Sequence, residues 1–98
     1  VCRLLAYRVA WMQGQGLVPN KEASMCKLFV TEAQQRLSQV GIKALGLHGQ
    51  LAEGSKWAPL KGRVEWDYLL MVSATIAGGT SEIQRSVIAR RGLGLPRD

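Results

Sequence analysis

Hydrophobic residues recur at helical spacing near the start of the chain. Cys2, Leu5, Val9 and Met12 follow one another at intervals of 3, 4 and 3 residues, which places them on one face of a helix. Glycines follow at positions 14 and 16, and Pro19 opposes an immediate restart. The pattern therefore predicts a first helix over residues 2–13.

A longer periodic stretch comes next. Its apolar positions are spaced 4-3-4-3-4: Cys26, Val30, Ala33, Leu37, Val40 and Ala44. Asn20 is suited to cap a helix here, and Glu22 suits the positive end of the helix dipole. Gly46 and Gly49 are expected to end the helix. The pattern predicts a helix of roughly seven turns, a length that suits a helix bundle.

The second half of the chain predicts a loop and two further helices. Periodicity is absent over residues 49–62, which indicates either a functional loop or a solvated connection. Residues 64–77 are apolar on nearly every side and predict a buried helix, central in a larger protein. A fourth helix is expected after Thr80, a good N-cap, and should end at Gly92. No strand pattern occurs, so the predicted fold class is all-α.

Composition excludes several classes of protein. The 98 residues are 47% hydrophobic and 20% charged, which predicts one small globular domain. No apolar run is long enough for a membrane span. One histidine and two cysteines are too few for a structural zinc site, so no metal site is predicted. Cys2 and Cys26 are expected to be reduced core residues. The chain begins with Val1 rather than Met, and we expect it to be a piece of something longer.

The net charge is positive, but it does not identify a binding partner. Lys and Arg number 13 and Asp and Glu number 7, so the formal net charge is +6. Such a surface attracts nucleic acid, acidic lipid or phosphate-bearing cofactors. A basic recognition helix with interleaved aromatic residues is lacking, so nucleic acid is not the favoured partner.

The residues best suited to bind a ligand are Gly78-Gly79-Thr80-Ser81-Glu82. Glycines permit positive φ and a close backbone approach by a ligand. The first N–H groups of a helix have no partner within it and can receive a phosphate or a developing oxyanion. An ordinary turn between helices is the alternative. The stretch is not a P-loop, because no Gly-Lys-Ser/Thr follows at the required spacing.

The sequences of four segments resemble those of a known protein family. Residues 78–85 read Gly-Gly-Thr-Ser-Glu-Ile-Gln-Arg and, with Leu-Gly-Leu-Pro at 93–96, closely resemble the C-terminal end of acyl-CoA dehydrogenases. Residues 22–29, Glu-Ala-Ser-Met-Cys-Lys-Leu-Phe, and residues 44–49, Ala-Leu-Gly-Leu-His-Gly, resemble the two ends of that family's penultimate long helix. The resemblance covers nearly the whole chain.

The resemblance implies a fold and a function. Residues 1–98 would be most of a C-terminal helical domain, an up-and-down four-helix bundle, with the N-terminal helical and middle β domains lying outside them. Such flavoproteins use FAD to oxidise the Cα–Cβ bond of an acyl-CoA thioester to the enoyl-CoA, a reaction of fatty acid metabolism. Electrons then pass to an electron-transfer flavoprotein. The assemblies are homo- or hetero-tetramers, and the bacterial likeness and thiol usage imply the cytoplasm.

The resemblance also assigns site residues. Thr80, Ser81 and Glu82 match the family's flavin-contacting triplet. Gly79 matches the glycine whose backbone lies by the acyl thioester. Gly49 matches the first glycine of a turn that, from a neighbouring subunit, approaches the nucleotide half of the flavin.

One departure from the family concerns catalysis. Many members carry the catalytic glutamate where this chain has Gly78, so no catalytic residue is assigned here. Either the carboxylate comes from an earlier helix, or the chain is a non-catalytic subunit or a binding homologue of the same fold. Glu53 and Glu65 are interpreted as loop and surface charges. Trp57 is expected to cover an acyl pocket or a subunit contact, or else to pack locally.

Overall fold

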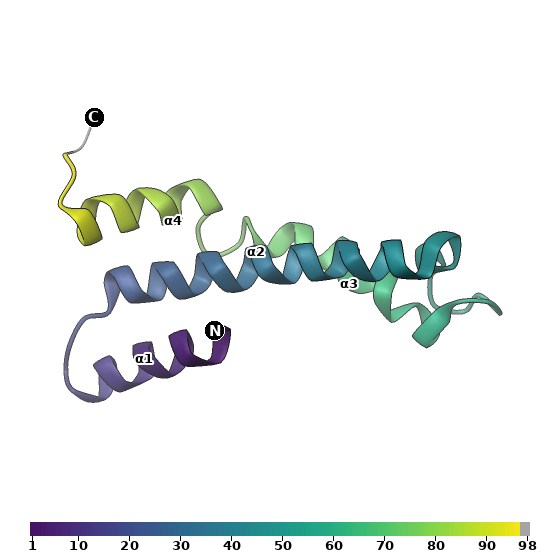
Figure 1. Ribbon diagram of the computed structural model, residues 1–98, viewed down its shortest axis with the longest axis horizontal. Helices are drawn as coiled ribbons and strands as arrows, with labels where there is room; N and C mark the ends of the chain where they lie inside the picture. Colours follow the sequence, from purple (N-terminus) through teal and green to yellow (C-terminus); the bar gives the residue numbers. More distant parts are fainter. Residues whose placement is uncertain (97–98) are drawn as a thin grey trace. The chain divides into compact units, whose positions relative to one another are not determined.

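The fold is built from helices alone. The computed structural model describes residues 1–96, and these contain four α-helices and three short helical turns but no strand (Figure 1). In chain order the elements are α1 (Cys2–Gly14), α2 (Asn20–Leu45), η1 (Gly46–Gln50), η2 (Pro59–Gly62), α3 (Arg63–Ala74), α4 (Ser81–Val87) and η3 (Ile88–Gly92). The predicted all-α class with four helices is confirmed.

Most helix boundaries follow the predicted breakers. α1 ends at Gly14, and α2 runs for 26 residues up to Leu45. Gly46 then adopts a φ of +58°, a conformation that suits glycine and ends a helix. The fourth helix is shorter than predicted: α4 ends at Val87, and the chain continues to Gly92 as a π-helical turn. The predicted loop over residues 49–62 is also too long, because η1 and η2 occupy its two ends.

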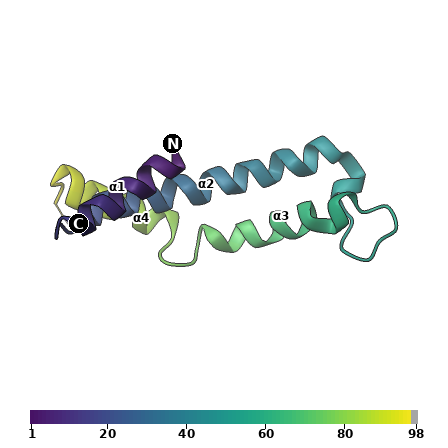
Figure 2. The ribbon, with the colours of Figure 1, turned by 90° about the horizontal axis from the view of Figure 1, so that it is seen from below.

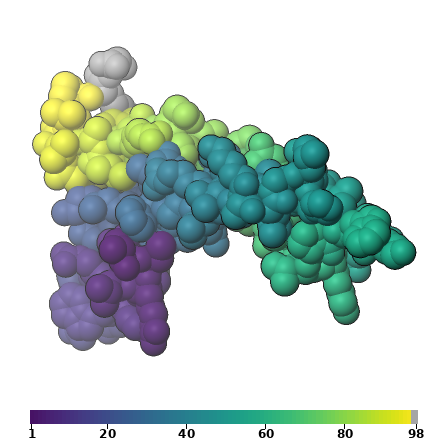
Figure 3. Space-filling view, turned by 45° about the vertical axis from the view of Figure 1, so that its right-hand side comes forward, coloured from purple at the N-terminus to yellow at the C-terminus, as the bar shows by residue number. Residues whose placement is uncertain are grey.

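The chain divides into two units, which are described separately. The first contains Val1–Val30 and the described residues from Gly78 onward. Within it, α1 and α4 both lie against the N-terminal part of α2 (Figures 1 and 3). A Cβ on Gly92 would stand 2.8 Å from Cδ of Lys21, so η3 packs directly on the start of α2.

The second unit contains Thr31–Ala77. Here the C-terminal part of α2 and helix α3 run antiparallel, side by side (Figure 2). The two helices approach closely at Gly41, where a Cβ would stand 3.2 Å from Cγ1 of Val64. The chain turns back through residues 51–58 and η2, and Gly62 packs against the backbone of Ala52 and Glu53. Small residues therefore set the closest approaches in this unit.

The apolar faces of the helices are exposed in the described residues, and their burial in a larger protein stays a prediction. None of the hydrophobic residues in the described part is buried. Helix α3, predicted to be buried, has no buried residue, and the exposed fraction of Leu69 is 60%. On α2, Leu37 and Val40 of the predicted stripe are 69% and 60% exposed. The helical spacing is correct, but these apolar faces are open surfaces within the described residues.

The buried side chains with polar groups are Ser24, Ser38, Ser81 and Gln84. Two of them, Ser81 and Gln84, lie on α4. The two cysteines, predicted to be in a core, are only half-buried and carry free thiols. In residues 1–96, no helix has the length and apolar content needed to cross a bilayer.

Candidate functional site

A glycine turn precedes α4. After α3 ends at Ala74, the chain reaches Gly78 and Gly79, whose φ angles are +67° and +99°. Residues with a Cβ rarely adopt these angles, so the turn depends on its glycines. Thr80 then returns to an extended conformation, with φ −62° and ψ 163°, and α4 begins at Ser81. The predicted positive φ of the glycine pair is present.

Thr80 caps α4 as its sequence position predicts. Its Oγ1 accepts a hydrogen bond from the N–H of Ile83 at 3.3 Å. The carboxylate of Glu82 accepts from its own backbone N–H and from the Thr80 hydroxyl, and these two bonds hold the pKa of Glu82 below its ordinary value of 4.5. Thr80 thus accepts one hydrogen bond and donates another. Ser81 is buried, whereas Glu82 is exposed.

Two side chains that sequence reasoning missed hold the turn. Gln84 Nε2 donates to the carbonyl oxygen of Gly78 at 3.0 Å. Lys27 Nζ, on α2, donates to the carbonyl oxygen of Gly79 at 2.7 Å. The helical pattern assigns both residues to polar faces, and no spacing rule connects Lys27 to a carbonyl 52 residues later. For Gln84 the sequence gives only a weak indication of such a role, because it lies near the start of the helix that follows the glycine pair.

The five predicted site residues do not all belong to one unit. Gly79, Thr80, Ser81 and Glu82 lie together at the start of α4, in the first unit. Gly49 belongs to the second unit and is buried within η1. A Cβ there would stand 3.0 Å from the backbone oxygen of Ile42, so only glycine fits without a shift.

The remaining candidate residues are exposed or half-buried. Glu53, interpreted as a loop charge, is exposed in the loop, and Glu65, interpreted as a surface charge, is half-buried in the first turn of α3. Trp57 is 67% exposed, and Lys56 Nζ lies 5.1 Å from the centroid of its ring. Among residues 1–96, no group of three or more metal-ligating side chains is present.

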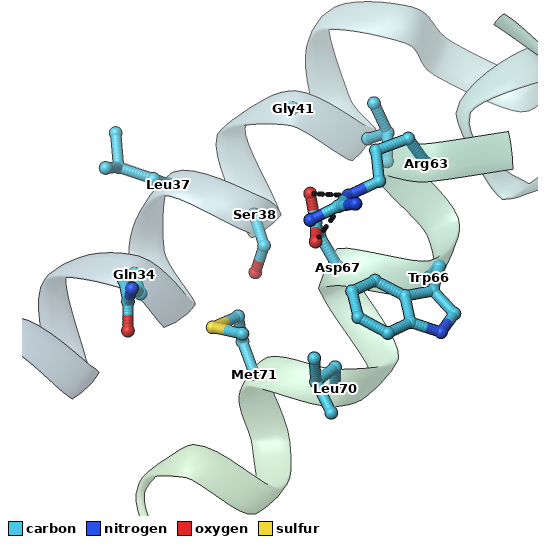
Figure 4. Close-up of a pocket in the computed structure, with 10 residues that line it drawn as sticks. Gln34, Leu37, Ser38, Gly41, Arg63, Trp66, Asp67, Leu70 and Met71 are labelled. Carbon is cyan, nitrogen blue, oxygen red and sulfur yellow. Dashed lines mark hydrogen bonds and ion pairs between the residues drawn. The ribbon is translucent and has the colours of Figure 1, made fainter. Parts of the chain in front are cut away.

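A groove of about 500 Å³ lies in the second unit, between α2 and α3 (Figure 4). It is lined mainly by apolar side chains, among them Leu37, Leu70 and Met71. Arg63 forms an ion pair with Asp67 at its edge, with 3.0 Å between Nε and Oδ1, and its guanidinium lies 4.7 Å from the Trp66 ring centroid. This groove contains no group suited to acid–base catalysis other than that paired carboxylate.

Comparison with known proteins identifies the family of this chain. The profile of the family "Acyl-CoA dehydrogenase, C-terminal domain" matches residues 1–93. The chain belongs to this family. Acyl-CoA dehydrogenase FadE26 of Mycobacterium tuberculosis is 38% identical to it over 76 residues, which are 78% of this chain and 19% of that protein.

Solved structures resemble this acyl-CoA dehydrogenase domain over 99% of its length. A chain of the ChsE4-ChsE5 complex from Mycobacterium tuberculosis is 35% identical, with a TM-score of 0.88. A chain of the Tcur3481-Tcur3483 steroid ACAD is 27% identical, with a TM-score of 0.91. This chain covers 25% of each of those two chains, so it spans about a fifth to a quarter of the length of its relatives.

Proposed function

We propose that this domain is part of an FAD-dependent acyl-CoA dehydrogenase that oxidises the Cα–Cβ bond of an acyl-CoA thioester. The observation that carries the proposal is the glycine turn with its capped, polar helix start, in a chain of this family. In the reaction, a base removes a proton from Cα, and a hydride leaves Cβ as the double bond forms. When bound, FAD supplies the acceptor for that hydride.

The residues at the start of α4 fit such a cofactor. A flavin ring presents both hydrogen-bond donors and acceptors at its edge. Glu82 offers an exposed, ionised carboxylate as an acceptor, and Thr80 offers a hydroxyl held in place by two hydrogen bonds. We assign flavin contacts to Thr80, Ser81 and Glu82, and to Gly49 from a neighbouring subunit. Ser81 contributes through its backbone, because its side chain is buried.

Gly79 is assigned to the substrate. Without a Cβ, its backbone leaves room for the thioester to approach. Its carbonyl oxygen is already bonded to Lys27, so the group available to the substrate is its N–H. Since one structural relative is described as a steroid ACAD, we propose a bulky acyl group, such as a steroid side chain, rather than a short straight chain.

The base is not expected at position 78. Gly78 carries no titratable group, and its φ of +67° disfavours a residue with a Cβ. We therefore place the catalytic carboxylate on another segment of the same protein or on a partner subunit. The solved relatives described as ChsE4-ChsE5 and Tcur3481-Tcur3483 each pair two different proteins, which supports a hetero-oligomer. A bacterial cytoplasmic location and an electron-transfer flavoprotein as electron acceptor complete the proposal.

A second candidate function follows from the same glycine. A non-catalytic subunit needs no base, and Gly78 removes the family's usual one. Such a subunit would keep the fold and the interface while its partner performs the chemistry. In that case the neighbouring subunit would hold the complete set of catalytic groups.

The test uses the longest natural polypeptide that contains these residues, produced alone and together with a candidate partner subunit. Bound flavin is read from its visible absorbance, and its bleaching is followed without oxygen after addition of a steroid-type or a straight-chain acyl-CoA. Bleaching with the steroid-type thioester supports the proposed enzyme. Flavin that is bound only by the partner supports the non-catalytic subunit. If neither preparation binds flavin, both proposals are wrong.

A further inference from the structure

The hydrogen bonds to the glycine turn orient two consecutive peptide groups. In a trans peptide the N–H points opposite to the C=O, and the described chain has no cis peptide bond. The carbonyl of Gly78 faces Gln84, and that of Gly79 faces Lys27. The N–H groups of Gly79 and Thr80 therefore point away from these two side chains. No backbone carbonyl in residues 1–96 accepts either N–H.

Gln84 fits the turn by shape as well as by hydrogen bonding. Its side chain is buried, and its Nε2 stands 2.7 Å from where a Cβ on Gly79 would lie. The absence of that Cβ is what allows the amide to reach the carbonyl of Gly78. Because Gln84 lies one turn into α4, its bond ties the turn to the helix that Thr80 caps.

Lys27 ties the same turn to a different helix. It lies on the N-terminal part of α2, which belongs to the same unit as the turn. Its half-buried ammonium donates a charge-assisted hydrogen bond, which is shorter and stronger than a bond between neutral groups. Without such bonds, a glycine pair has more conformational freedom than any other dipeptide. The turn is thus restrained from α2 and from α4 at once.

We infer that Lys27 and Gln84 are positioning residues of the active site, which restrain the glycine turn so that the N–H groups of Gly79 and Thr80 face the substrate and flavin. This inference rests on the proposed function. Neither side chain needs to touch a ligand, since each acts through the carbonyl that it binds. Binding geometry is sensitive to such restraint, because a shift of about 1 Å can lower the rate by about 100-fold.

The experiment compares four variants in the full-length protein, with its partner subunit if it has one. Lys27→Met and Gln84→Met remove a donor at similar side-chain length. Lys27→Arg keeps a cationic donor, and Lys43→Met removes an exposed lysine from the last turn of the same helix. The measurements are KM and kcat per bound flavin with an acyl-CoA, and hydrogen exchange of the amides of residues 79–83.

Both methionine variants at the turn should lower kcat/KM by about tenfold to a hundredfold, mainly through a higher KM, and should speed exchange at residues 79–83. The kcat/KM of Lys43→Met should stay within about twofold of that of the natural protein. The kcat/KM of Lys27→Arg should lie between that of Lys27→Met and that of Lys43→Met, because a planar guanidinium differs in shape from an ammonium. A residue that only stabilises the fold would lower the flavin content but leave KM per loaded site unchanged.

The results separate failure of this inference from failure of the proposed function. If the natural protein oxidises acyl-CoA and the Lys27 and Gln84 variants keep its KM and its exchange rates, the positioning role is wrong and the function stands. If the natural protein binds no flavin and oxidises no acyl-CoA, the function is wrong. The exchange rates at residues 79–83 then still decide whether Lys27 and Gln84 restrain the turn. If Lys27→Met does not fold, Lys27→Arg and Gln84→Met still test whether these side chains restrain the turn.

Discussion

Gln84 Nε2 occupies the space beside Gly79 that a side chain would need, since a Cβ there would come within 2.7 Å of it. The neighbouring Gly78 also has a positive φ, but a Cβ at that position would meet nothing within 4 Å. The two glycines therefore differ in the space that is available for a side chain. Gly78 is required by its backbone angle, whereas Gly79 is required by its angle and by its neighbour.

This difference gives a matched pair of substitutions. Gly78→Ala should cost about 1–2 kcal/mol, the strain of a left-handed residue with a Cβ. Gly79→Ala should cost more by about 1–3 kcal/mol, because Gln84 must move and lose its bond to Gly78. Native-state hydrogen exchange of residues 78–84 measures both local free energies. Equal effects of the two substitutions would contradict the close contact with Gln84.

The cap of α4 gives a second prediction. Thr80→Val keeps the shape but removes the acceptor for the N–H of Ile83, and should destabilise α4 by about 1 kcal/mol. Thr80→Ser keeps the hydroxyl and is the control. Exchange of the Ile83 amide should rise in the valine variant and stay near its natural rate in the serine variant. The same exchange rate in both variants would mean that the hydroxyl does not cap the helix.

Glu82 gives a pH dependence whose sign is defined. Its folded-state pKa lies below the ordinary 4.5, first because of its own backbone N–H and then because of the Thr80 hydroxyl. A carboxylate with a lowered folded pKa stabilises the fold above its ordinary pKa, and this contribution is lost as the pH falls through the lowered value. The natural protein should thus melt at a higher temperature than Glu82→Gln at neutral pH.

At a pH below the folded pKa of Glu82, the two melting temperatures should converge, because the carboxyl is then protonated in both the folded and unfolded states. Glu53→Gln, at an exposed loop position, is the control for removing one charge from a basic chain. A gap between the natural protein and Glu82→Gln that persists at low pH would show that the bonds to the ionised carboxylate are not its source.

Local sequence rules predicted the ends of α1 and α2 and the cap of α4, because the residues that determine them lie within a few positions of one another. The end of α4 at Val87, before the predicted Gly92, was not predicted. Gly46 and Thr80 act on their own backbone neighbourhood, and both act as expected. Lys27 could not be found in this way. Its hydrogen bond to Gly79 depends on how two distant segments pack. The helical pattern indicates only that Lys27 lies on a polar face. Gln84 was likewise assigned to a polar face, although its amide is buried on the turn.

The burial of residues 64–77 in a larger protein stays a prediction. Periodicity shows which residues of a helix share an apolar face, but it does not show whether that face is covered within the same chain. Residues 64–77 have the composition of a buried helix, yet α3 has no buried residue in residues 1–96. The apolar pattern indicates contacts beyond the described residues, and this chain covers only a fifth to a quarter of the length of its relatives.

A strained turn in the second unit offers a stabilising substitution. Leu60 and Lys61 both have left-handed backbones, with φ angles of +49° and +55°, and both are exposed. Asparagine tolerates this conformation better than lysine does. Lys61→Asn should therefore stabilise the chain by about 0.5–1 kcal/mol, measured as a rise in melting temperature. Lys56→Asn, at another exposed lysine of the same loop, is the control and should give no rise.

The open apolar faces predict where assembly takes place. Leu69 on α3 and Val40 on α2 are largely exposed, and a glutamate at either position would keep the helix while removing an apolar contact. Burying such a side chain fully contributes about 1.5–3 kcal/mol, so its loss should weaken an assembly by about tenfold to a hundredfold, and a buried charge would weaken it further. Leu69→Glu and Val40→Glu should therefore shift the full-length protein toward smaller species in analytical ultracentrifugation.

Val18→Glu is the control, because Val18 is more exposed than these two and lies in the connection between α1 and α2. Its assembly should match that of the natural protein. The local stability of each variant, measured by hydrogen exchange of α2 and α3, should change little, since neither Leu69 nor Val40 is buried within this chain. If Leu69→Glu and Val40→Glu assemble with unchanged affinity, these faces are not the assembly surfaces, and their exposure needs another cause. If all three variants weaken assembly equally, the effect comes from added negative charge and not from the apolar faces of α2 and α3.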